Sequence, residues 1–277
     1  MHPLRSRLAE LTALTGALAA AVSLLDGPAY GAGLAIVVAA GGFGTFMLLA
    51  EREPRGVPLE SLALPLVATF AFVGLPHLAG VGPWWPIALL AGAAALVAAV
   101  ATEARLLGPV DERRSRAERQ LLPLTVALAF AAFAAAAGSI PGGIAEPLTG
   151  AAPGPDGTLS AAGLSVARSS LLLLGLLDAG IAFLLGYRLA ALRTTSASEA
   201  AWAAGTFAVV IGISAALFRA VDLPRLFGPA VLAGVFYLWS TYRGASAAQR
   251  RSFAWLWEYV VLAAALALAV VWNLLLR

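Results

Sequence analysis

The sequence contains no cysteine and no lysine, and its only histidines are His2 and His77. The lack of cysteine excludes disulfides, thiolate catalysis and cysteine-bound metals. The lack of lysine excludes a Schiff-base or P-loop lysine, and all eighteen basic residues are arginines. Two histidines, one of them at the extreme N-terminus, are too few for a bis-histidine haem or a histidine-rich metal cluster. We therefore expect neither a metal nor a cofactor.

Charge is also scarce in this chain. Only 12% of the 277 residues are charged, 61% are hydrophobic, and the mean hydropathy is +0.87. A soluble domain carries about 25% charged residues, so the composition places the chain in the membrane class. The length accommodates about nine spans of ~20 residues with short connections. We predict an all-α, polytopic transmembrane bundle that forms one integral-membrane domain over residues 1–277.

Nine apolar segments separated by polar or Pro/Gly-containing turns are the predicted spans. They cover residues 8–25, 30–50, 59–78, 85–107, 121–140, 164–189, 200–221, 226–242 and 254–276. Because Arg5 and Arg7 precede it, the first segment could instead be a cleaved signal peptide, which would leave eight spans. Its apolar stretch is longer than the ~7–15 residues of a usual signal-peptide core, which favours a retained helix.

Two connections stand out between these spans. Residues 141–163 are rich in Pro, Gly and Ala, and we predict that they form the longest extracytoplasmic loop. Residues 108–120 alternate acidic and basic side chains and are predicted to lie in the cytoplasm. A solvated helical extension with i,i+4 ion pairs is expected there, with partner docking as the alternative.

The arginines predict the orientation, because cytoplasmic loops of membrane proteins carry an excess of basic residues. An N-in, C-out chain places most of them on one side: Arg5, Arg7, Arg52, Arg55, Arg105, Arg113, Arg114, Arg116, Arg119, Arg188, Arg193, Arg243, Arg250 and Arg251. The other side keeps Arg168, Arg219, Arg225 and Arg277. Since the positive charge belongs to loops next to the membrane, the basic pI of about 9.8 does not indicate a nucleic-acid partner.

Asp178 is the most informative ionisable residue, because it lies near the middle of a predicted span. The ten Leu, Ile and Phe side chains of residues 169–187 contribute about −3 to −6 kcal/mol to insertion, against about +3 kcal/mol for a central Asp. A stripe of small residues at helical spacing runs close to it: Gly175, Ala179, Ala182 and Gly186. Asp178 should therefore face other helices or a wet cavity rather than lipid. An ionisable group there predicts a proton or ion site; the alternative is a carboxyl group that only fixes helix packing.

Two further carboxylates are candidates for the same site. Glu258 and Glu60 each lie about one turn inside the start of a predicted span. Either residue could assist Asp178. The alternative for both is an interfacial carboxylate that snorkels to water.

A separate polar cluster is predicted at the outer interface. Its members are Arg168, Arg219, Asp222, Arg225 and His77. Arg168 would snorkel or bind lipid phosphate, while Arg219 and Asp222 have the i,i+3 spacing of an ion pair. His77 is either a pH-responsive group or an interfacial polar tip.

These observations leave three functional hypotheses for a protein of a bacterial-type cytoplasmic membrane. The first is a small transporter in which Asp178 carries a proton or a cation. The second is a non-catalytic subunit or scaffold of a larger complex, with protein partners or further copies of this chain beside the lipid bilayer. The third is a lipid-modifying enzyme that uses the outer polar cluster. Hydrolase, metalloprotease and prenyl-diphosphate motifs are missing from the sequence, so we expect no catalytic residue.

Overall fold

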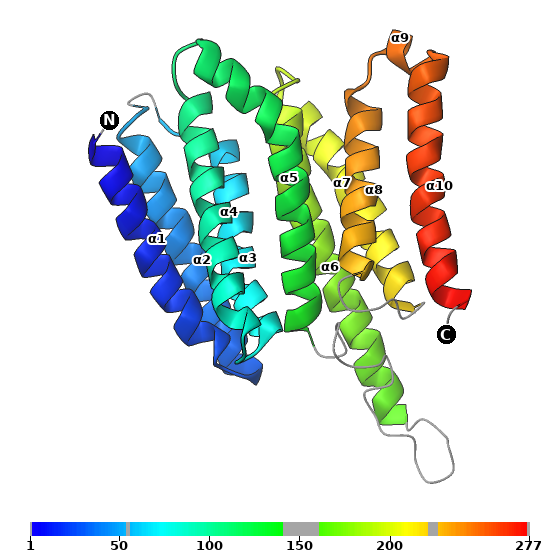
Figure 1. The fold of residues 1–277 in the computed structure, drawn as a ribbon, viewed down its shortest axis with the longest axis horizontal. Helices are drawn as coiled ribbons and strands as arrows, with labels where there is room; N and C mark the ends of the chain where they lie inside the picture. Colours follow the sequence, from blue (N-terminus) through cyan, green and yellow to red (C-terminus); the bar gives the residue numbers. More distant parts are fainter. Residues whose placement is uncertain (1, 54–55, 141–160, 221–226, 276–277) are drawn as a thin grey trace.

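The computed structural model describes residues 2–53, 56–140, 161–220 and 227–275. This part of the chain is helical and contains no strand (Figure 1). The helices are α1 (His2–Ser23), α2 (Gly27–Ala50), the 3-10 helix η1 (Leu59–Leu62), α3 (Ala63–Ala79), α4 (Trp84–Leu106), α5 (Glu112–Ser139), α6 (Ala161–Ala191), α7 (Ala197–Ala220), α8 (Phe227–Gly244), α9 (Ala247–Arg250) and α10 (Phe253–Leu275).

A helix lies at each of the nine predicted segments, and the main difference in bounds concerns α5. This helix begins at Glu112, within the charged segment 108–120. Asp111 caps it, because its carboxylate accepts a hydrogen bond from the Arg114 backbone N–H at 2.9 Å. Arg114 and Glu118 form an i,i+4 ion pair at 3.2 Å. The charged segment is therefore largely the first turns of α5, as expected for a solvated helical extension.

Within the part of the chain that the structure describes, six helical segments are long and apolar enough to cross a membrane, by length and composition. They are Gly27–Ala50, Leu59–Ala79, Trp84–Leu106, Glu112–Ser139, Leu171–Ala191 and Ala197–Phe218. An all-helical chain with six such segments is compatible with a multi-pass membrane protein. The predicted spans in α1, α8 and α10 fall outside this set. Arg5, Arg7 and Glu10 make the start of α1 polar, and α8 has only 18 residues and ends with Arg243 and Gly244. Their spanning role stays a prediction.

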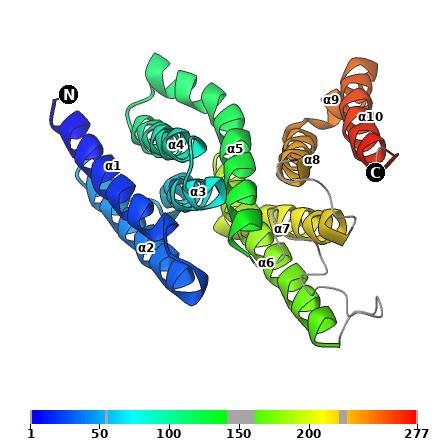
Figure 2. The same ribbon diagram turned by 60° about the horizontal axis from the view of Figure 1, so that its bottom comes forward.

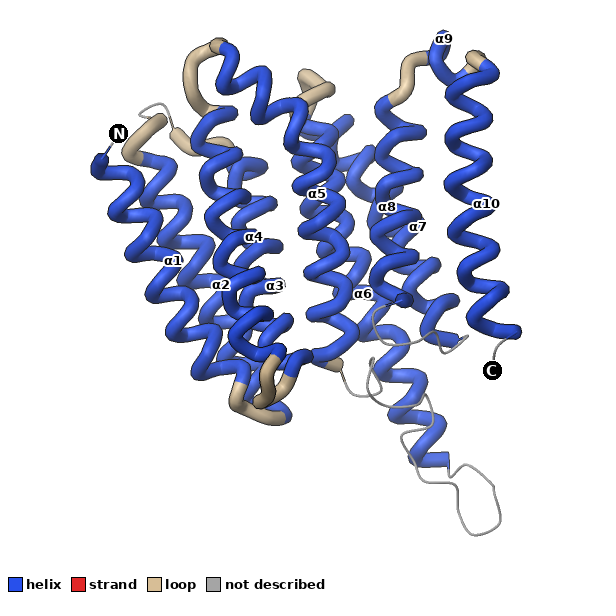
Figure 3. The backbone as a smooth tube through the Cα atoms, in the orientation of Figure 1, coloured by secondary structure: helices blue, strands red, loops and turns tan. Residues whose placement is uncertain are grey.

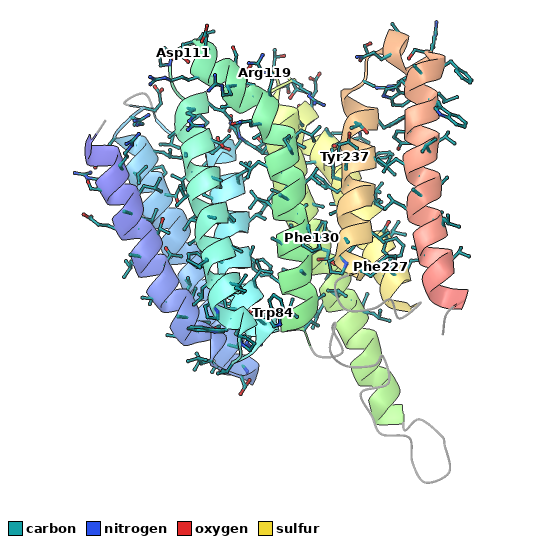
Figure 4. All side chains as sticks on the ribbon, viewed as in Figure 1. Trp84, Asp111, Arg119, Phe130, Phe227 and Tyr237 are labelled. Atoms are coloured by element: carbon teal, nitrogen blue, oxygen red, sulfur yellow. The ribbon has the colours of Figure 1, made fainter. Side chains whose placement is uncertain are left out.

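Successive long helices run in opposite directions, so the connections alternate between the two ends of the bundle (Figure 1). The start of α1 shares one end with the α2–α3, α4–α5, α6–α7 and α8–α10 connections. We call this the arginine end, because the described arginines of the predicted cytoplasmic set lie at or near it. Figure 4 shows Asp111 and Arg119 at this end and Trp84 at the opposite end. Arg55 and residues 141–160 of the predicted loop 141–163 lie outside the described residues, whereas residues 161–163 form the start of α6 rather than loop.

The helices do not pack uniformly. The central helix α3 contacts α1, α2, α4, α5 and α6, whereas α10 packs on α8 and α9 at the edge of the bundle (Figure 2). The largest fully buried side chains include Phe72, Phe133 and Phe236. The first turns of α5 tilt away from the rest of that helix (Figure 3). The helix contains Pro123, which has no backbone N–H group, so one internal hydrogen bond is missing and the helix can bend.

Candidate functional site

The Asp178 side chain lies inside the bundle, and its exposed fraction is only 1%. Its carboxylate oxygen Oδ1 is buried and has no hydrogen-bond partner. The apolar residues that share its row on α6 are also buried: Leu174, Ile181 and Leu185. A buried polar atom without a partner costs about 1–3 kcal/mol, and more for a charged group. Asp178 therefore lowers the stability of the folded chain relative to an apolar residue at this position.

The stripe of small residues beside Asp178 is the surface on which α6 meets α7. A Cβ atom added to Gly212 on α7 would lie 3.2 Å from the Gly175 carbonyl oxygen and from the Ala179 Cβ atom. A Cβ atom added to Gly186 would lie 2.8 Å from the Phe207 ring. The small side chains thus let the two helices approach closely, as predicted for this stripe.

A second ionic group lies near the arginine end. Arg188 on α6 donates two hydrogen bonds to Glu103 on α4, from Nε to Oε1 and from Nη2 to Oε2, each at 2.7 Å. The exposed fractions of the two side chains are 5% for Arg188 and 0% for Glu103. This bidentate geometry is the strongest form of an arginine–carboxylate contact. The two charges are matched to each other, so the pair is complete without a ligand.

Glu60, another of the predicted candidates, lies near this ion pair. It lies in η1, half-buried, and is close enough to Glu103 for their carboxylates to interact electrostatically. Arg188 follows Asp178 by ten residues, which is about 15 Å along a helix. The structure therefore brings Glu60 near Glu103, whose partner Arg188 lies about two to three helical turns from Asp178. The Glu258 side chain lies outside the described residues, on α10.

His77 takes part in a hydrogen-bonded network at the end opposite the arginines. Its ring stacks on the Tyr30 ring with centroids 3.8 Å apart, and Nδ1 lies 3.1 Å from the Ser23 carbonyl oxygen, so Nδ1 carries the hydrogen. The Trp85 Nε1–H group donates to the Ser23 hydroxyl at 3.1 Å. The Tyr30 hydroxyl lies 2.8 Å from the Ser139 hydroxyl, which itself donates to a backbone carbonyl of α5. This network links five consecutive helices, α1, α2, α3, α4 and α5, at this end of the bundle.

The other members of the predicted outer cluster are not described. The side chains of Arg168 and Arg219, and the whole of Asp222 and Arg225, lie outside the described part of the chain. Whether they gather around His77 stays a prediction. Among the residues that the structure describes, no group of three or more His, Asp or Glu side chains could hold a metal ion.

The Glu103–Arg188 pair was missed by reasoning from the sequence. Both residues fall inside predicted apolar segments, close to the ends that carry the arginines. Opposite charges at matching depth in two spans are the feature that could have indicated a pair.

No protein-family model matches the sequence, and neither a curated protein nor a solved structure matches it. The function is therefore argued from the chemistry of these groups. Glu103, Arg188 and His77 have partners that satisfy them, whereas the buried Asp178 oxygen has none. Among the described residues, the buried side-chain atoms without a partner are Thr45 Oγ1 and Asp178 Oδ1, and Asp178 is the ionisable one of the two.

Proposed function

We propose that this chain is a small multi-pass transporter in which Asp178 binds a proton or a cation. The observation that carries the proposal is the Asp178 Oδ1 atom, which is buried and unpartnered in an apolar helix. Ionisable residues inside a membrane are costly, and they commonly mark ion pathways or proton relays. A carboxyl group needed only for packing would be expected to hydrogen-bond to a neighbour.

The protonation state of Asp178 would select between two arrangements of the bundle. A protonated carboxyl group is tolerated in the closed packing of α6 on α7. An ionised one requires water or a cation beside it, so ionisation favours an arrangement that admits them. The α6–α7 contact is built from small residues, among them Gly175 and Gly212, which present little side-chain bulk to resist such a change.

The orientation we propose is N-in and C-out with nine spans in a bacterial-type cytoplasmic membrane. Its support is the gathering of the described arginines of the cytoplasmic set at one end of an alternating bundle. In this arrangement the Glu103–Arg188 pair lies near the cytoplasmic surface, and Asp178 lies deeper in the membrane.

The test is ion flux into proteoliposomes that contain the purified chain and a trapped pH-sensitive dye. With a potassium diffusion potential set by valinomycin, we expect wild-type protein to carry protons and Asp178→Asn to lose at least nine-tenths of that flux. Glu118→Gln is the matched control, because Glu118 is an exposed carboxylate in an i,i+4 pair. Replacing the potential with a sodium gradient tests whether Asp178 binds a cation rather than a proton. Equal fluxes for wild type and Asp178→Asn under both conditions would contradict it.

A second candidate function is a non-catalytic subunit of a larger membrane complex, and α10 is the observation that favours it. No described side chain of α10 is fully buried, although the helix has 23 residues and is largely apolar. Among the described residues, its main contacts are with α8 and α9. A stoichiometric partner that co-purifies in mild detergent, and is lost when apolar residues of α10 are replaced, would support this role. Flux from the isolated chain would count against it.

The lipid-modifying enzyme has less support than either. It would need Arg168, Arg219 and Arg225 to form a cluster at the headgroups, and their side chains lie outside the described residues. No described group favours this chemistry.

A further inference from the structure

A cavity of about 710 Å³ opens at the arginine end, between α1, α4 and the α4–α5 connection. Five arginines line it, together with one acidic residue: Arg5, Arg52, Arg105, Arg113, Arg116 and Asp111. They come from the start of α1, the residues after α2, the end of α4 and the start of α5. Such a convergence from separate parts of the chain is produced by the fold and does not follow from a basic run in the sequence.

Among the described residues, none of these five arginines forms a salt bridge, although Arg52 Nη1 donates to the Ala104 carbonyl oxygen at 3.4 Å. The salt bridges of the described residues join other arginines to acids: Arg7 to Glu51, Arg114 to Glu118 and Arg188 to Glu103. Asp111 is the one acid in the cavity wall, and its Oδ1 atom accepts from the Arg114 backbone N–H. The cavity therefore carries an excess of positive charge that a bound anion would relieve.

The inner wall of the cavity is apolar and continues along the bundle. Leu8, Val97 and Ala104 form part of it. Val97 also lines a second groove of about 500 Å³ that runs between α1 and α4. The groove is lined mainly by apolar residues: Ala9, Ala13, Phe72, Leu89, Leu90 and Ala93. Thr12 lies there too, but its hydroxyl donates to the Leu8 carbonyl oxygen at 2.7 Å and is satisfied.

A cationic cavity that shares Val97 with an adjoining apolar groove fits an amphiphile with an anionic head. One arginine guanidinium group can donate two parallel hydrogen bonds to two phosphate oxygens. It therefore suits phosphate recognition better than an ammonium group does. Basic pockets between membrane-spanning helices are typical sites for phospholipid headgroups. A free phosphate would use the arginines but leave the groove between α1 and α4 without a role.

We propose that this site binds one anionic phospholipid, with its phosphate among the five arginines and an acyl chain in the groove between α1 and α4. The site is separate from Asp178 and does not depend on transport. A bound lipid would join α1 to α4 and to the start of α5.

The test is lipid binding to the purified full chain in mild detergent, measured by native mass spectrometry with phosphatidylglycerol as the probe. We expect one tightly bound phosphatidylglycerol and about fivefold weaker binding for each arginine removed in Arg105→Gln, Arg113→Gln and Arg116→Gln. Arg119→Gln is the matched control, because it removes the same charge from α5 outside the cavity. Ala93→Trp should block the groove and weaken binding at least tenfold, whereas Ala94→Trp, one residue along α4 and outside the groove, should not.

Three outcomes would overturn the proposal. Equal binding of zwitterionic phosphatidylcholine would show that the arginines do not select the headgroup. Equal weakening by Arg119→Gln and Arg113→Gln would indicate general surface charge rather than a site. Displacement of phosphatidylglycerol by millimolar inorganic phosphate, together with no effect of Ala93→Trp, would assign the cavity to a free anion instead of a lipid. Because the readout is lipid binding, none of these outcomes depends on whether the chain transports ions.

Discussion

Arg188 holds both carboxylate oxygens of Glu103 in the interior of the bundle, joining α6 to α4 with two hydrogen bonds of 2.7 Å. The two residues are 85 positions apart in the sequence. Desolvation of two charges offsets much of their attraction, so such a pair adds little net stability, but removing one partner leaves the other charge buried alone. The pair is therefore a constraint on which helices become neighbours.

The first prediction concerns this constraint. Replacement of Arg188 by Met keeps much of the side-chain volume but leaves the Glu103 carboxylate without its partner. We expect the free energy of unfolding to fall by about 3–5 kcal/mol, measured by tryptophan fluorescence during denaturant unfolding in detergent. The control is Arg114→Met, which removes an exposed i,i+4 pair worth about 0–1 kcal/mol. Similar losses for the two variants would contradict a specific role for the buried pair.

The second prediction concerns the contact between α3 and α4. Gly92 lies against the backbone of Phe72, and a Cβ atom at Gly92 would lie 2.7 Å from the Phe72 Cα atom. Because a backbone atom cannot rotate away, we expect Gly92→Ala to destabilise the bundle by about 1–3 kcal/mol. Gly180→Ala, on an open face of α6 with no atom within 4 Å of the added Cβ, should leave the thermal midpoint unchanged or slightly raised. A neutral Gly92→Ala would mean that α3 and α4 are not packed this closely.

The third prediction concerns the network at the opposite end. Tyr30→Phe keeps the ring that stacks on His77 but removes the hydroxyl bonded to Ser139, so we expect a loss of about 0.5–1.5 kcal/mol of stability. Ser139→Ala should cost a similar amount, and the double variant should cost less than the sum of the two. Additive losses in this double-mutant cycle would show that the two hydroxyls do not interact.

The fourth prediction concerns orientation. The sequence has no cysteine, so a single introduced cysteine can be labelled without interference. Ser115 lies at the arginine end and Gly82 lies in the α3–α4 connection at the opposite end, and both are exposed. For an N-in chain, we expect a membrane-impermeant maleimide to label Gly82→Cys in intact cells and Ser115→Cys only after permeabilisation. The reverse pattern would invert the proposed topology.

Hydropathy alone predicted where the helices lie, because a chain in lipid must satisfy its backbone hydrogen bonds within each apolar segment. The capped and paired start of α5 was also predictable, because its partners lie within one helical turn of each other. The small-residue stripe of Gly175, Ala179, Ala182 and Gly186 predicted a close helix contact, which the structure assigns to α7, and the inward position of Asp178. These features depend on the helical spacing of residue types and on composition, which are local properties of the sequence.

The remaining features depend on which helices become neighbours. Glu103 and Arg188 are each an unremarkable charge near the end of an apolar segment until the fold brings the end of α4 within reach of the Arg188 side chain on α6. The five arginines of the cavity come from four separate segments, and Glu60 of η1 lies close enough to Glu103 of α4 for their carboxylates to interact electrostatically. The sequence by itself determined the helices, the grouping of their charged ends and the inward acid on α6. Only the tertiary structure decided which charges are paired and which remain open to a ligand, because pairing over such separations requires the helices to be packed together first.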